Sequence, residues 1–140
     1  MKMDFVIISQ LLKQSNSLLK SGYLAFILSI IILSLFSKMQ VIFPLLLITG
    51  LLIVHHYVFV RVQFDQGLIQ HMIEQPENIE NLTQQLDQSL LKLKLIPAEK
   101  TGRDWLQRFK GCLRLFRIQM SIVLVQYAVF IVLFYKLAHR

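Results

Sequence analysis

The sequence has few of the residues on which disulfide-bonded, metal-binding and catalytic proteins depend. It contains one cysteine, Cys112, so no disulfide can form within the chain. We find no P-loop, GxSxG, HExxH or CxxC motif and no dinucleotide-binding fingerprint. We also find no cluster of carboxylates and no nucleophile paired with a base. The sequence therefore predicts neither an enzyme nor a cofactor-binding protein.

Acidic residues are also scarce. Eight Asp and Glu stand against 15 Lys and Arg, and the formal net charge is +7. In a soluble protein such an excess suggests nucleic acid as a partner, but no DNA- or RNA-binding motif accompanies it. Basic residues also flank membrane spans and face anionic lipid head groups. We therefore attribute the charge to a lipid bilayer and expect no nucleic-acid partner.

Long apolar runs are abundant, and 55% of the residues are hydrophobic. Residues 41–60 contain no Asp, Glu, Lys or Arg, and a helix of this length crosses a bilayer core of about 30 Å. Shorter apolar runs occupy residues 22–36 and 118–135. The predicted fold class is therefore all-α: an integral membrane protein with three transmembrane helices, consisting of an N-terminal helical hairpin and a long C-terminal helix.

We divide the chain into four segments. They are an amphipathic N-terminal segment (1–20), the transmembrane hairpin (21–60), a cytoplasmic helical region (61–117), and the third transmembrane helix with a short external tail (118–140). The first segment places Phe5, Ile8 and Leu12 near one face. It either lies in the membrane interface or extends the first span and packs on a neighbouring helix.

Within residues 61–117 the charges are separated along the chain. Residues 62–91 carry only acidic charges, whereas residues 92–117 carry eight basic and two acidic residues. We expect an acidic helix folded against a basic one. The basic helix is predicted to begin at a capping box, Thr101 to Asp104, and to continue into the third span.

The distribution of Lys and Arg predicts the orientation in the membrane. Residues 1–20 hold three of them and residues 61–117 hold nine, against one in the turn 37–40 and two after residue 135. Cytoplasmic segments carry the excess of Lys and Arg in membrane proteins. We therefore expect a multi-pass protein of the plasma (inner) membrane with a cytoplasmic N-terminus and an external C-terminus.

Two adjacent histidines, His55 and His56, lie within the second span. Ionisable residues inside a span are functional candidates, and imidazole also ligates haem iron and other metals. Adjacent residues of a helix point about 100° apart, so the two rings do not easily serve one site. We favour a hydrogen-bonding role and leave open proton handling and haem or metal binding.

Small and polar residues within the spans are candidates for helix packing. These are Gly22, Ala25, Ser29, Gly50 and Gln126. Small side chains let helices approach closely in lipid, and a buried amide usually bonds a neighbouring helix. Gln126 could instead line a polar path. We expect these residues to join the chain to other membrane subunits or to a second copy of itself.

A basic stripe precedes the third span. Its members are Arg103, Lys110, Arg114 and Arg117, at spacings of seven, four and three residues. We expect Arg114 and Arg117 to contact anionic lipid head groups. Arg103 and Lys110 are expected to pair with Glu80 and Asp87 of the acidic helix.

The function predicted from these features is that of a non-enzymatic oligomeric or accessory subunit of a larger membrane complex. Two alternatives remain open. The first is a holin-like or small-channel pore former, a homo-oligomer whose lumen holds Gln126, the serines or His55. The second is a haem- or quinone-binding redox subunit that uses His55 or His56.

Overall fold

The computed structural model describes residues 2–36 and 39–139. These residues form helices joined by short turns, with no strand among them. The elements are α1 (Lys2–Lys13), α2 (Ser15–Phe36), α3 (Met39–Glu74), the short 3-10 helix η1 (Pro76–Asn78), α4 (Ile79–Lys92), the 3-10 helix η2 (Ala98–Lys100) and α5 (Trp105–Ala138). The all-α prediction is confirmed.

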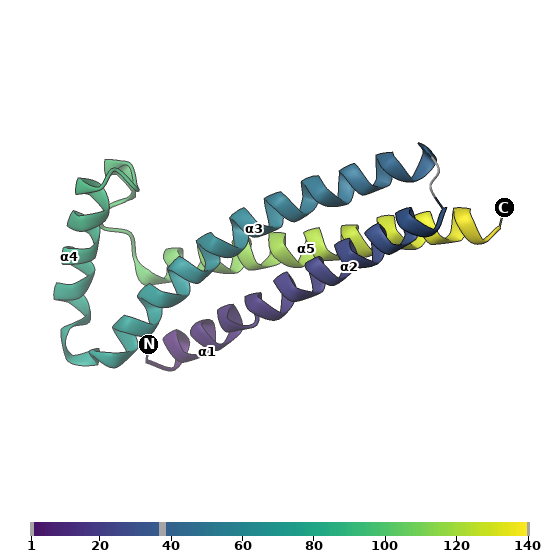
Figure 1. The fold of residues 1–140 in the computed structure, drawn as a ribbon. Helices are drawn as coiled ribbons and strands as arrows, with labels where there is room; N and C mark the ends of the chain where they lie inside the picture. The colour runs from purple at the N-terminus through teal and green to yellow at the C-terminus, as the bar shows by residue number, and fades with distance from the viewer. Residues whose placement is uncertain (1, 37–38, 140) are drawn as a thin grey trace.

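Three long helices form a bundle, and α4 lies across one end of it (Figure 1). α1 and α2 follow each other almost in line, α3 runs antiparallel to α2, and α5 returns parallel to α2. α2, α3 and α5 all pack on one another. The N-terminus lies at the α4 end of the bundle and the C-terminus at the opposite end (Figure 1).

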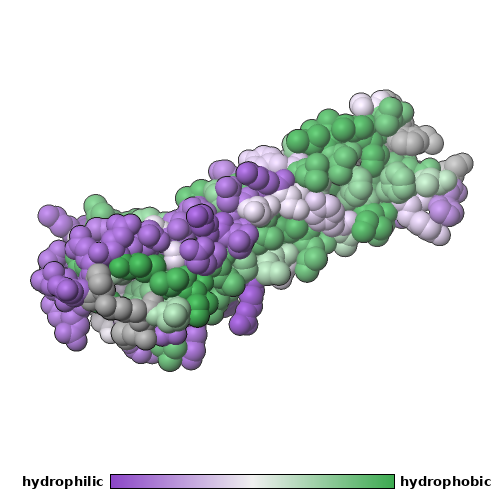
Figure 2. All heavy atoms as spheres, turned by 90° about the horizontal axis from the view of Figure 1, so that it is seen from below, coloured by the Kyte–Doolittle hydropathy of each residue, from purple (hydrophilic) through white to green (hydrophobic). Residues whose placement is uncertain are grey.

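Each predicted span lies within one of the long helices. Among the described residues, three helical stretches are long and apolar enough to cross a membrane: Met3–Ile32, Ile42–Glu74 and Trp105–Ala138. α3 has 36 residues, about 54 Å at 1.5 Å per residue, which exceeds a bilayer core of about 30 Å. Hydrophobic residues gather toward the end of the bundle away from α4, and hydrophilic residues gather around α4 (Figure 2).

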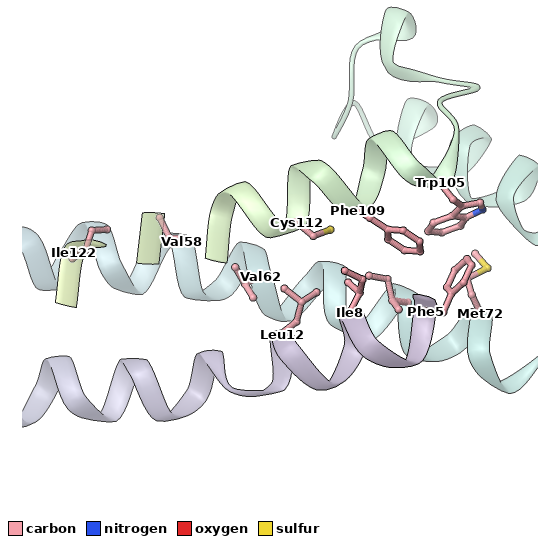
Figure 3. Close-up of a cluster of buried hydrophobic side chains, with 11 residues drawn as sticks. Phe5, Ile8, Leu12, Val58, Val62, Met72, Trp105, Phe109, Cys112 and Ile122 are labelled. Carbon is pink, nitrogen blue, oxygen red and sulfur yellow. The ribbon is translucent and has the colours of Figure 1, made fainter. Parts of the chain in front are cut away.

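The N-terminal segment packs inside the bundle. α1 contacts both α3 and α5, so the structure has the second of the two arrangements that the sequence left open. Phe5 is the centre of an aromatic cluster, with ring centroids 4.8 Å from Trp105 and 4.9 Å from Phe109 (Figure 3). Ile8 and Leu12 follow Phe5 one and two turns later and are also buried. Because this core holds α1 against α3 and α5, it sets the position of α2.

The start of α5 differs from the prediction. The helix begins at Trp105, and the residue before it, Asp104, makes no side-chain capping bond. Gly102 has a φ of +69°, which lies outside the helical region. The predicted capping box from Thr101 to Asp104 is therefore wrong, because the chain turns at Gly102 before the helix starts.

α4 is attached to α5 through Asp87. The Asp87 carboxylate accepts two bonds from Arg108 Nη2, at 2.7 and 2.8 Å, and a third from the backbone N–H of Gly102 at 2.8 Å. The Trp105 indole N–H donates to Thr83 Oγ1 of α4 at 3.0 Å. Neither Arg103 nor Lys110 is in an ion pair within the described part of the chain. The prediction that Arg103 and Lys110 pair with the acidic helix is therefore wrong, because Asp87 is paired with Arg108 instead.

Candidate functional site

The three long helices enclose a layer of polar side chains. Five of them are fully buried: Ser15 and Ser29 of α2, His55 of α3, and Gln119 and Gln126 of α5. Polar groups rarely lie in an apolar core unless they bond one another, so these residues form the candidate functional site. We call the set the polar layer.

Gln119 joins all three helices at one end of the polar layer. Its amide oxygen accepts a hydrogen bond from Ser15 Oγ at 2.5 Å, and its Nε2 donates to the Ser15 carbonyl at 3.1 Å. The same Nε2 lies 3.0 Å from His55 Nε2. Since an amide nitrogen can only donate, His55 Nε2 is the acceptor, and a neutral ring then carries its proton on Nδ1.

The other nitrogen of His55 faces a notch at Gly22. A Cβ added at Gly22 would lie 2.7 Å from His55 Nδ1 and 3.0 Å from Gln126 Oε1. Any larger residue at this position would collide with the imidazole, which explains the glycine. His55 Nδ1 and both polar atoms of the Gln126 amide have no hydrogen-bond partner among the described residues. The notch is therefore flanked by an unpaired ring nitrogen and an unpaired amide oxygen.

The predicted small-residue face packs within the chain. Gly22, Ala25 and Ser29 of α2 all point into the bundle, and Ser29 Oγ donates to the Ala25 carbonyl at 2.8 Å. Gln126 is buried in the same interior. Gly50 differs, because it is exposed on the outer side of α3 and a Cβ there would meet nothing within 4 Å. Of the five candidates, Gly50 is thus the one whose surface is free for another chain.

The two histidines do not share a site. His55 is fully buried in the polar layer, while His56 is exposed on another face of α3, with its ring centroid 6.3 Å from that of Phe59. In residues 2–36 and 39–139, no three His, Cys, Asp or Glu side chains gather closely enough to hold a metal ion. The bonded Nε2 makes His55 a hydrogen-bonding residue of the layer.

Sequence reasoning missed two members of the layer, Ser15 and Gln119. Gln119 precedes Gln126 by seven residues, and this spacing places both amides on one side of α5. Gln119 could therefore have been predicted from its spacing to Gln126. A further pair, Ser21 and Tyr127, brings two hydroxyls to 3.0 Å between α2 and α5.

The basic stripe is only partly formed. Lys110, Arg114 and Arg117 are exposed along α5, whereas Arg103 lies before the helix and its carbonyl accepts a bond from Arg108 Nε at 3.1 Å. Arg114 and Arg117 lie within four residues of the third predicted span, which starts at residue 118. This position is consistent with contact to lipid head groups.

No match to this chain is found among family models, curated proteins or solved structures. The function is therefore argued from the arrangement of side chains alone. That arrangement can hold helices in register through the polar layer.

Proposed function

We propose that this protein is a non-enzymatic multi-pass protein of the plasma (inner) membrane that works as a subunit of an assembly, with other membrane chains or with copies of itself. The observation that carries the proposal is an apolar cleft between the start of α3 and the end of α5, with a volume of about 780 Å³. Its lining residues include Phe43, Pro44 and Leu47 of α3 and Val129, Val132 and Leu133 of α5.

Gly50 extends the α3 wall of this cleft. Phe43, Leu47 and Gly50 follow one another at spacings of four and three residues, so they share one face of the helix. Phe43 is 75% exposed although it is a large apolar side chain. Small residues beside apolar ones let two helices approach closely in lipid. The cleft and Gly50 together suit the transmembrane helix of a partner.

The two alternative functions have less support from the side-chain positions. A pore formed by several copies needs polar residues on an outer face, but Gln126, Ser29 and His55 lie between the helices of a single chain. A redox subunit needs a histidine with a free ring nitrogen beside a cofactor-sized space. His55 bonds Gln119 through Nε2, and its Nδ1 faces only the Gly22 notch.

Replacing Gly50 with leucine should break the assembly without harming the fold. A leucine there enters open space, so the stability of the single chain should stay within about 0.5 kcal/mol, while close approach of a partner helix is blocked. The measurement is the native mass of the protein in mild detergent, with co-purifying chains identified. We expect the mass to fall to that of one chain.

Gly67→Leu is the matched control for this experiment. Gly67 also lies exposed on α3 with nothing within 4 Å of an added Cβ, but it lies beyond the second predicted span, residues 41–60. It should keep the wild-type assembled mass. If Gly50→Leu also kept that mass, or if the wild type ran as a single chain without partners, the proposed function would be wrong.

We further propose a cytoplasmic N-terminus and an external C-terminus, supported by the asymmetry of Lys and Arg. Cysteines introduced at Lys136 and at Lys38, a position outside the described residues, should react with an impermeant maleimide in intact cells. A cysteine at Lys92, exposed at the end of α4, should react only after permeabilisation. The native Cys112 is buried and should contribute little background. If Lys92→Cys alone were labelled in intact cells, the orientation would be the opposite of the one proposed.

A further inference from the structure

A second cleft lies between α3 and α5 at the α4 end of the bundle, with a volume of about 770 Å³. This volume falls within the usual range of small-molecule sites. Its apolar lining includes Tyr57, Val60, Phe64, Leu95 and Ile118. All five are exposed although they are large and hydrophobic. We call this cleft the basal groove.

The rim of the basal groove is strongly basic. Arg61, Lys100, Arg103 and Arg114 line it, all four are exposed, and none is in an ion pair within the described residues. The carboxylate of Asp65 also lines the groove and accepts a bond from the Cys112 thiol at 3.6 Å. The groove therefore combines an apolar wall with an excess of unpaired positive charge, which suits an anionic amphiphile.

The basal groove reaches residues of two predicted membrane spans. Tyr57 and Val60 belong to the second predicted span and Ile118 begins the third, whereas Leu95 follows α4 at the far end. An occupant can therefore enter from the bilayer without crossing water. Arg61 and Arg114 adjoin the ends of these spans, at the level where the phosphates of a leaflet lie.

We propose that the basal groove binds one anionic phospholipid of the adjoining leaflet. Its phosphate is held by Arg61 and Arg114, and one acyl chain lies along the apolar wall toward Leu95. This is more than general attraction to head groups, because it requires a bounded site. It is also independent of the partner cleft, which lies at the other end of α3 and α5.

The protein carries its own probe for this site. Trp105 is the only tryptophan in the sequence, and it lines the basal groove. It precedes the third predicted span, residues 118–135, by 13 residues, or about 20 Å of helix. With that span in the bilayer core, the acyl chains of the surrounding lipid do not reach it. Bromine atoms on an acyl chain quench tryptophan fluorescence only at short range. Quenching of Trp105 therefore reports a chain that has entered the groove.

The test uses the full-length protein in mixed phosphatidylglycerol–phosphatidylcholine vesicles, with bromine on the chains of one lipid or the other. We expect brominated phosphatidylglycerol to quench Trp105 severalfold more than brominated phosphatidylcholine. Equal quenching by the two lipids, or no quenching by either, would overturn the proposal. Quenching by an added brominated fatty acid but by neither phospholipid would also overturn the proposal, because it would identify a fatty acid as the occupant.

Two pairs of variants separate a bounded site from general attraction. Arg114→Gln should abolish the quenching and Arg117→Gln should retain it, because Arg117 is also exposed, one turn away, but does not line the groove. Gly111→Phe should also abolish it, since Gly111 lines the groove and its Cβ position is open, while Gly67→Phe should not. Loss of quenching in Arg117→Gln equal to that in Arg114→Gln would refute a bounded site.

Discussion

Asp87→Ala should release α4 from the bundle. The change removes the partner of an Arg108 guanidinium whose side chain is only 16% exposed, and it also frees the N–H of Gly102. Breaking a mostly buried pair by removing one member costs about 3–5 kcal/mol. Because every 1.4 kcal/mol is tenfold, the rate of proteolysis in residues 76–100 should rise by a factor of about 10² to 4 × 10³. Limited proteolysis in mild detergent measures it.

The controls for this prediction use the other charged residues of the region. Exchanging the pair, Asp87→Arg with Arg108→Asp, should restore part of the protection. Lys110→Glu should stay within about 0.5 kcal/mol of wild type, because Lys110 is exposed and has no carboxylate partner among the described residues. Unchanged proteolysis in Asp87→Ala would mean that the ion pair does not hold α4 in place.

Gln119→Leu should destabilise the bundle by about 2–4 kcal/mol, because a buried polar group left without its partner costs about 1–3 kcal/mol. The change removes the acceptor of Ser15 Oγ and the donor to both the Ser15 carbonyl and His55 Nε2. These groups lie fully buried and cannot turn to water. Thermal unfolding in mild detergent should show a clearly lowered midpoint.

Gln126→Leu is the matched comparison, since it makes the same substitution seven residues later in the same helix. The Gln126 amide is fully buried, and neither of its polar atoms has a partner among the described residues. Replacing it with an apolar side chain of similar size should therefore be neutral or stabilising. Equal destabilisation by the two variants would show that Gln126 bonds something within the folded protein.

The long helices could be predicted from the sequence because each contains a long apolar run, and such runs are typical of helices able to span a membrane. The burial of Phe5, Ile8 and Leu12 was predictable as a shared face, but the helices they contact were not, since periodicity says nothing about the partner. The choice of Arg108 for Asp87, among eight basic residues nearby, depends on the angle at which α4 crosses α5. Similarly, the prediction of a capping box was wrong because the backbone turns at Gly102. A four-residue sequence pattern does not reveal that turn.

The continuity of α3 has a mechanical consequence. One unbroken helix of about 54 Å carries His55 of the polar layer, the cleft residue Leu47 and, at its far end, the residues that lead into α4. Beyond Pro44, α3 contains no proline at which a kink would absorb a change of tilt. A partner or lipid that tilts α3 at one end should therefore also displace its other end. Because α4 follows that end, a tilt of α3 about the polar layer would move α4.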